Sequence, residues 1–177
     1  LERPEREREE RTDLLLDILN LKPTDAVADV GAGTGYFSFR IAPRVPQGKV
    51  LAVDIQPEML GFIHRGMAAR KVTNVQPVLG TVEDPRLPAN SVDVALLVDA
   101  YHEFSHPREM MQRIAAALKP GGRVVLVEYR LEDPNVPIKT LHKMSVAQAE
   151  KEMRTAGLRK LRVSEKLPWQ HVMEFGK

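Results

Sequence analysis

Short apolar runs alternate with amphipathic runs along most of the chain, and this alternation predicts alternating strands and helices. Five runs rich in Val, Ala and Leu indicate buried strands, at 26–30, 48–55, 74–80, 91–100 and 123–129. Runs with helical spacing fall between and after them, at 36–45, 57–71, 107–122 and 145–158. Two further strand-like runs close the chain, at 159–166 and 170–176.

Strands that are apolar throughout must be covered on both faces, and strands that alternate with helices pair in parallel through right-handed crossovers. We therefore predict an α/β fold: a doubly wound, Rossmann-like, mostly parallel sheet with helices on both faces and an antiparallel last strand. Such sheets bind their ligands beyond the carboxyl ends of the strands, where the strand order reverses.

The first segment is densely charged and then apolar, with Leu14, Leu15, Ile18 and Leu19 at helical spacing. It predicts an N-terminal helix within 1–20 that covers part of the core. We expect one domain over 1–177, with a ligand-binding core at 21–129 and a segment at 130–177 that carries the opposite side of the site and the closing strands.

Composition narrows the class of protein without naming it. The 177 residues are 43% hydrophobic and 28% charged, with no cysteine and a net charge of +2. The charges are interspersed, so a nucleic-acid-binding face is not expected, and no run of 18 apolar residues indicates a membrane span. We expect a cytoplasmic protein; because the chain starts at Leu1 rather than Met, its N-terminus is expected to be trimmed, and a removed export signal stays open. The oligomeric state also stays open.

A glycine-rich turn follows the first strand, in the order Asp29-Val30-Gly31-Ala32-Gly33-Thr34-Gly35. Glycines allow positive φ and close approach of a ligand, and a helix start offers free N–H groups. A plain tight turn explains the same pattern, so the turn alone does not decide. The spacing departs from the dinucleotide pattern G-x-G-x-x-G, because Tyr36 stands where the third glycine belongs.

Acids end the first two strands. Asp29 would repel a pyrophosphate at the helix start, but it suits a ligand with a cationic group. Asp54 lies nineteen residues after Gly35 and can accept hydrogen bonds from both hydroxyls of a ribose, a feature that NAD enzymes share.

Four blocks now follow one another: "VADVGAGTGYFSFRIA", "VLAVDIQPEML", "SVDVALLVDAYHEFSHP" and "LKPGGRVVLVEY". Their order and spacing resemble the class I S-adenosylmethionine-dependent methyltransferases, over about 14–129. The chain looks most like the small-molecule group that includes ubiquinone/menaquinone-type enzymes. It is similar, too, to short bacterial members of unassigned substrate, whose later segment resembles "DPNVPIKTLHKMS".

The resemblance implies S-adenosylmethionine as the cofactor. Asp29 would bind its amino group through water, Asp54 its ribose hydroxyls, and Ile55 would lie against the adenine. The family's usual acid in the third motif is replaced by Thr81, which leaves Glu83 or Asp84 open as substitutes. The full set of implied cofactor residues is Asp29, Gly31, Ala32, Gly33, Gly35, Tyr36, Asp54, Ile55, Thr81, Val82, Glu83, Val98 and Asp99.

The stretch "HEFSH", from His102 to His106, also matches the zinc-hydrolase pattern H-E-x-x-H. That pattern needs both histidines on one helix face. Here Pro107 follows directly and disfavours helical angles at His106, so both histidines are predicted to lie in a loop. No third ligand follows at a recognisable spacing, and we expect no metal site.

The same loop follows the fourth strand, where the resemblance puts the methyl acceptor. His102 or Tyr101 would orient or deprotonate the acceptor, or His102 is a capping or packing residue. His142, with Lys139 and Lys143, would line the acceptor site from the segment after the fifth strand, or this segment is a plain solvated loop. His171 is expected to be structural.

The sequence thus predicts a methyltransferase that acts on a small-molecule acceptor. Two other classes remain open: a cofactor-binding module without catalysis, and, less favoured because the third loop glycine is absent, an NAD-type oxidoreductase.

Overall fold

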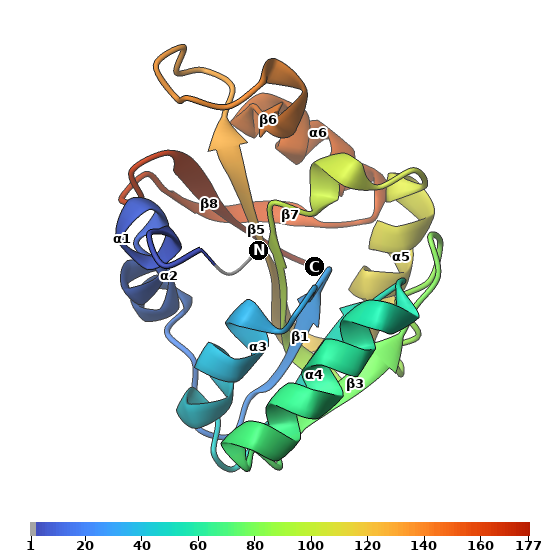
Figure 1. Cartoon of the computed structure of the whole chain (residues 1–177). Coiled ribbons are helices and arrows are strands. Elements are labelled where there is room, and N and C mark those ends of the chain that lie inside the picture. Colours follow the sequence, from blue (N-terminus) through green and yellow to red (C-terminus); the bar gives the residue numbers. More distant parts are fainter. Residues whose placement is uncertain (1–2) are drawn as a thin grey trace.

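The computed structural model describes residues 3–177, which form one mixed sheet with helices on both faces (Figure 1). Within these residues the strand order is β3-β2-β1-β4-β5-β8-β7, and β6 pairs with β5 outside this path. The strands are β1 Ala26–Val30, β2 Lys49–Asp54, β3 Val75–Leu79, β4 Val92–Val98, β5 Leu118–Arg130, β6 Lys143–Met144, β7 Arg159–Ser164 and β8 Gln170–Gly176.

Strands β1 to β5 pair in parallel, and β8 runs antiparallel between β5 and β7. The predicted doubly wound sheet with an antiparallel last strand is therefore confirmed. The strand order reverses between β1 and β4, so the predicted ligand edge lies at the carboxyl ends of these two strands.

Helices cover the sheet in two groups. The helices are α1 Arg6–Glu10, α2 Thr12–Leu19, α3 Tyr36–Ile41, α4 Pro57–Arg70, α5 Pro107–Ala117 and α6 Val146–Thr155, with short 3-10 turns η1 Ala42–Arg44, η2 Tyr101–Glu103 and η3 Thr140–His142. Figure 1 shows α1 to α3 on one side of the strands and α5 and α6 on the other. None of the helices within residues 3–177 has the length and apolarity needed to cross a bilayer.

Alternating side chains of the central strands build two separate cores. In β4, Leu96 packs with the side chains of α2 and α3, whereas Leu97 packs with those of α5 and α6. Both leucines are fully buried. This alternation is why the strands read as apolar throughout in the sequence.

Two predicted elements differ from the structure. The expected N-terminal helix is broken into α1 and α2, because Arg11 has a left-handed φ of 53°; residues 1–2 of that prediction lie outside the described part. The helix expected over 107–122 ends at Ala117, and Leu118 already pairs with Val92 as the start of β5. Pro120 and the glycines after it are a strand entry rather than a helix end.

Candidate functional site

A cavity of about 420 Å³ opens at the carboxyl ends of β1, β2 and β4. Its lining comes from the glycine turn, the residues after β2 and β4, the loop after β3 and helix α1. All but two of the predicted cofactor residues line it. The exceptions are Gly35, which packs beneath the turn, and Glu83.

The glycine turn is fixed by its conformation and by its neighbours. Gly31 has a φ of 80°, and a Cβ there would meet the Ala100 Cβ at 2.9 Å. Gly35 has a φ of 89°, and a Cβ there would meet the Phe39 ring at 2.8 Å. Any larger side chain at either position would push the turn off the neighbouring loop or helix.

Asp54 is held by the turn on one side and by its own loop on the other. Its carboxylate oxygens accept hydrogen bonds from the backbone N–H groups of Gly33 and Gln56, each at 2.9 Å. A carboxylate oxygen has more than one lone pair, so both oxygens can still accept from a ligand. Asp54 lines the cavity and is placed to receive a pair of hydroxyls.

Two acids line the cavity: Asp29, which is buried, and Asp99, which is partly buried. Ser38 Oγ donates to Asp29 at 2.6 Å, and Gln170 Nε2 donates to both oxygens of Asp99 at 3.0 and 2.8 Å. Burial raises the pKa of Asp29 to about 6 and that of Asp99 to about 7. Burial thus disfavours the charged forms of both acids although Arg6 acts on them, and a ligand with an ammonium or sulfonium group would stabilise these forms.

Helix α1 brings Arg6 to the cavity, and this is a contribution that sequence reasoning missed. The Arg6 guanidinium lies 4.3 Å from the centre of the Tyr36 ring, and its Nε donates to Glu10 at 2.9 Å. The Tyr36 hydroxyl lies 2.9 Å from Thr12 Oγ1. The N-terminal segment thus covers the cavity, but nothing in its alternating charges separated Arg6 from its solvated neighbours.

The loop after β3 presents apolar surface rather than an acid to the cavity. Thr81 Oγ1 is turned into its own loop, where it accepts from the backbone N–H of Asp84 at 3.0 Å. Glu83 points to His106, with 3.5 Å between its Oε1 and Nε2. Ile55 and Val82 line the cavity with 48% and 44% of their surface exposed. Neither Glu83 nor Asp84 lines the cavity, so neither replaces the acid expected at Thr81.

Of the residues after β4 that were expected at the acceptor site, Tyr101 points away from the cavity. The Tyr101 ring is buried, and its hydroxyl donates to Glu152 Oε2 at 2.6 Å, away from the cavity. Burial, followed by the Glu152 carboxylate, raises the pKa of Tyr101 far above its usual value. We therefore correct the prediction that Tyr101 orients or deprotonates an acceptor. Its neighbours Glu103, Phe104 and Ser105 line the cavity instead.

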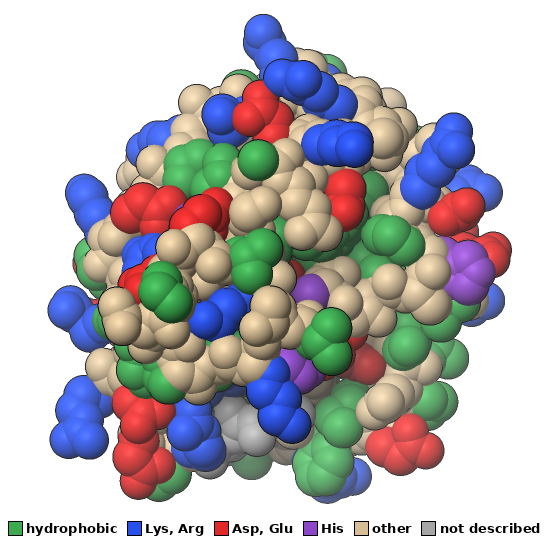
Figure 2. Space-filling model, turned by 90° about the horizontal axis from the view of Figure 1, so that it is seen from above, with side chains coloured by type: hydrophobic (Ala, Val, Ile, Leu, Met, Phe, Trp, Pro, Cys, Tyr) green, Lys and Arg blue, Asp and Glu red, His purple; other side chains and the backbone are tan. Residues whose placement is uncertain are grey.

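His102 is fixed from inside the protein. Its Nδ1 lies 2.7 Å from Oε2 of Glu128, which is fully buried, and Glu128 Oε1 accepts from the His102 backbone N–H at 3.3 Å. The Glu128 hydrogen bond raises the pKa of His102. His142 Nδ1 lies 3.1 Å from His102 Nε2, so the fold joins these two predicted residues although forty positions separate them. Seen from above, histidine side chains appear near the middle of the face (Figure 2).

The two histidines of "HEFSH" have different surroundings. His102 lies in η2, whereas His106 precedes α5 and contacts Ser105 Oγ at 3.0 Å and Glu83. The motif does not lie on an α-helix, which agrees with the sequence prediction. Its two histidines therefore do not share the helix face that zinc hydrolases use.

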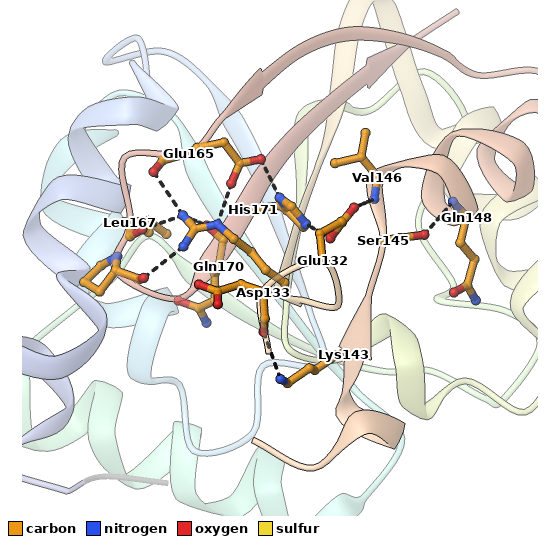
Figure 3. Close-up of polar contacts among 12 residues, drawn as sticks. Glu132, Asp133, Lys143, Ser145, Val146, Gln148, Glu165, Leu167, Gln170 and His171 are labelled. Carbon is orange, nitrogen blue, oxygen red and sulfur yellow. Dashed lines mark hydrogen bonds and ion pairs between the residues drawn. The ribbon is translucent and has the colours of Figure 1, made fainter. Parts of the chain in front are cut away.

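A polar cluster fixes the segment that carries His142 (Figure 3). His171 lies between Glu165 and Glu132, with its Nε2 at 2.7 Å from Glu132 Oε2. Glu132 Oε1 also accepts from the Val146 backbone N–H at 2.8 Å. Arg130 donates to the backbone oxygens of Leu167, Pro168 and Gln170. Through Glu132, His171 thus connects both ends of the segment 132–146 to β8. This is the structural role expected for His171.

The fold and the cavity together define a Rossmann-like α/β protein with one carboxylate placed for a diol and two further acids placed for a cation. The family described as "Methyltransferase domain" matches residues 27–122. An uncharacterized methyltransferase-like protein of Schizosaccharomyces pombe, C25B8.10, is 34% identical over 71% of this chain and 46% of its own length. The UbiE ubiquinone/menaquinone biosynthesis C-methyltransferase of Ectopseudomonas mendocina is 28% identical over 64% and 45%.

The crystal structure of a SAM-dependent methyltransferase from Aquifex aeolicus superposes with a TM-score of 0.89 at 24% identity, over 98% of this chain and 93% of that one. The chain belongs to the class I S-adenosylmethionine-dependent methyltransferase family. The chain spans less than half the length of the curated relatives it matches.

Proposed function

We propose that the chain binds S-adenosylmethionine in the cavity at the ends of β1, β2 and β4 and transfers its methyl group to a small-molecule acceptor. One observation carries the proposal: residues chosen from three of the four quoted blocks, together with Thr81 and Val82 of the third motif, line a single cavity, with Gly35 and Glu83 as the exceptions. A cavity of about 420 Å³ also falls in the usual size range of small-ligand sites.

The cavity has distinct ends that would orient the cofactor. Asp54 would accept the ribose hydroxyls, and the exposed apolar side chains of Ile55 and Val82 would flank the adenine. Asp29 and Asp99 would face the ammonium group, whose charge would stabilise the ionised form of both carboxylates. Arg6, brought by α1, would reach the carboxylate at the same end.

The acceptor would enter beside the loop that follows β4. Glu103, Phe104 and Ser105 line the cavity there, and His142 adjoins this loop through His102. When bound, the cofactor supplies a methyl group already activated on a sulfonium. The chain's own task is to hold the acceptor in line and to keep water away, so positioning accounts for most of the expected rate enhancement.

Calorimetry tests the proposal with S-adenosylhomocysteine and NAD⁺ as separate titrants. We expect one site for S-adenosylhomocysteine and at least tenfold weaker binding of NAD⁺. A screen of small hydroxyl, amine and carbon acceptors, read as release of S-adenosylhomocysteine, then tests catalysis. Tighter binding of NAD⁺ would contradict the cofactor site, whereas cofactor binding without turnover on any acceptor would favour a non-catalytic module.

A further inference from the structure

Three potential metal ligands converge beside the cofactor cavity: His102 Nε2, His142 Nδ1 and a carboxylate oxygen of Glu103. The nitrogens are 3.1 Å apart, His102 Nε2 lies 3.9 Å from Glu103 Oε1, and all three atoms lie within 4.8 Å of one another. His102 and Glu103 follow β4, whereas His142 follows β5. The fold therefore supplies the third ligand that no spacing in the sequence revealed.

These separations suit one shared ion. Zinc binds histidine nitrogen at about 2.0–2.1 Å, so two nitrogens of a tetrahedral site are about 3.3 Å apart. The observed 3.1 Å is close to that value. A direct hydrogen bond between the two imidazoles fits the same distance, but it gives no role to the Glu103 carboxylate on the same side.

Glu128 strengthens the case for an ion. It is fully buried and accepts from both the Nδ1 and the backbone N–H of His102. A proton held on Nδ1 leaves the Nε2 lone pair pointing at His142. A carboxylate behind a ligating histidine is the usual second partner in zinc sites, where it fixes the tautomer and the ring orientation.

The segment that carries His142 is also fixed, by strand pairing and by side-chain contacts. It ends η3 and precedes β6, which pairs with the end of β5. Its neighbour Lys143 donates to the Asp133 backbone oxygen at 3.2 Å, and Glu132 and His171 tie the same segment to β8. The ligand pair therefore rests on two anchored segments.

We propose that His102, Glu103 and His142 bind one divalent first-row transition-metal ion. Two imidazoles and one carboxylate suit zinc, iron or nickel, whereas magnesium prefers oxygen ligands. Three protein ligands leave a coordination position open, as in catalytic sites. This replaces the sequence expectation of no metal site, which rested on the loop position of His102 and His106 and on the missing third ligand.

The position of the ion indicates a class of acceptor, a step that rests on the proposed methyl transfer. Glu103 lines the cavity as well as the ligand cluster, so the open coordination position lies at the acceptor side. An ion there would bind a hydroxyl or enol oxygen and lower its pKa. The O–H proton would pass to solvent, and the oxygen's electron pair would form the O–C bond as the C–S bond breaks.

Zinc titration of tag-free, chelator-treated protein tests the site. We expect one Zn²⁺ per chain by calorimetry and by elemental analysis after desalting, at least tenfold weaker binding in His142→Ala and in Glu103→Gln, and no comparable binding of Mg²⁺. Glu128→Gln should weaken binding about 10–100-fold through His102. His106→Ala and His64→Ala are matched controls that remove a histidine outside the cluster, and both should bind zinc like the parent.

Cobalt gives an independent readout, because Co²⁺ on two imidazoles and a carboxylate absorbs visible light far more strongly than hydrated Co²⁺ does. His142→Ala should abolish that band. Absence of tight zinc binding, or binding that His106→Ala abolishes and His142→Ala leaves intact, would overturn the proposal. Affinity for S-adenosylhomocysteine is measured on the same variants: failure of metal binding with intact cofactor binding refutes only the metal site.

Discussion

The carboxylate of Asp54 has two roles, one structural and one in binding. It accepts the backbone N–H groups of Gly33 and Gln56, which joins the glycine turn to the loop after β2. Its remaining lone pairs face the cavity, where the ribose hydroxyls are proposed to bind. The same residue thus shapes the site and binds the ligand, and a substitution should affect the two roles to different degrees.

Asp54→Asn should weaken binding of S-adenosylhomocysteine by about 1.5–3 kcal/mol, the usual contribution of hydrogen bonds to a charged group. Calorimetry on the parent and the variant measures the loss. Asp84→Asn is the matched control, since Asp84 also accepts a backbone N–H, from Arg86, but does not line the cavity. Equal affinities for parent and Asp54→Asn would remove Asp54 from the cofactor site.

Asp99→Asn should separate stability from binding. Burial raises the pKa of Asp99 to about 7, whereas an unfolded aspartate titrates at about 3.9. Between about pH 3.9 and pH 7 the folded protein binds a proton at Asp99 that the unfolded chain does not bind. The free energy of unfolding of the cofactor-free protein therefore falls as the pH rises through this range, and the destabilisation is complete above pH 7. Asparagine avoids this loss and tolerates the left-handed φ of 50° at this position.

We therefore expect cofactor-free Asp99→Asn to be more stable than the parent by about 1–3 kcal/mol at pH 8, and to match it at pH 4. Urea unfolding at both pH values measures the difference. The same variant should bind S-adenosylmethionine more weakly, because the ammonium group loses a charged partner. If the variant is no more stable than the parent at pH 8, then the charged form of Asp99 does not destabilise the folded protein.

Some site residues followed from the sequence and others did not, for physical reasons. Asp29 and Asp54 lie at the carboxyl ends of β1 and β2, and a strand end has a predictable place at the sheet edge. The directions of Tyr101 and Glu103 depend on the turn η2, which puts the tyrosine into the core and the glutamate at the cavity. Residues two positions apart in a short turn can face opposite ways, and no periodicity reveals which one points to the ligand.

At the scale of elements, helix α1 is the part of the site with the weakest internal support. It has only five residues, and Glu10 is its buried member. A helix this short is not stable alone, so its order depends on what it packs against. The sequence did not predict the break between α1 and α2 at Arg11, because the charged residues on both sides of Arg11 are equally compatible with one continuous helix.

Binding of the cofactor should order α1. We expect its amide hydrogens to exchange at least tenfold more slowly with S-adenosylhomocysteine bound, while α2, whose Leu15, Leu16 and Leu19 are buried, changes little. Hydrogen exchange with mass spectrometry measures both segments. Arg6→Met keeps the apolar stem beside Tyr36 and removes the charge, so it should lose most of this protection. Unchanged exchange in α1 would mean that this helix does not close over the ligand.

At the scale of the whole molecule, the two cores share their strands. Leu96 and Leu97 are neighbours in β4, yet they pack into cores on opposite faces of the sheet. Because the same strands contribute side chains to both cores, unfolding of these strands would disrupt both cores together. The alternation of strands and helices in the sequence was enough to predict this architecture, because an apolar strand has to be covered on both faces.

The protein should therefore unfold as one unit. Leu96→Ala and Leu97→Ala should each cost about 2–5 kcal/mol, since both leucines are fully buried. Urea unfolding should give coincident transitions by Trp169 fluorescence and far-UV circular dichroism. Leu161→Ala, at a position that is 51% exposed, serves as the control with little effect. Separate transitions in either variant would show that the two cores fold independently.

The central claim is that one cavity holds the cofactor in a defined orientation, and a crystal structure with S-adenosylhomocysteine tests it most directly. We predict density for the ligand at the ends of β1, β2 and β4, with its ribose hydroxyls on Asp54, its ammonium group beside Asp29 and Asp99, and its sulfur facing the Glu103 side of the cavity. A ligand bound elsewhere on the molecule, or bound in this cavity with its ribose away from Asp54, would contradict the account.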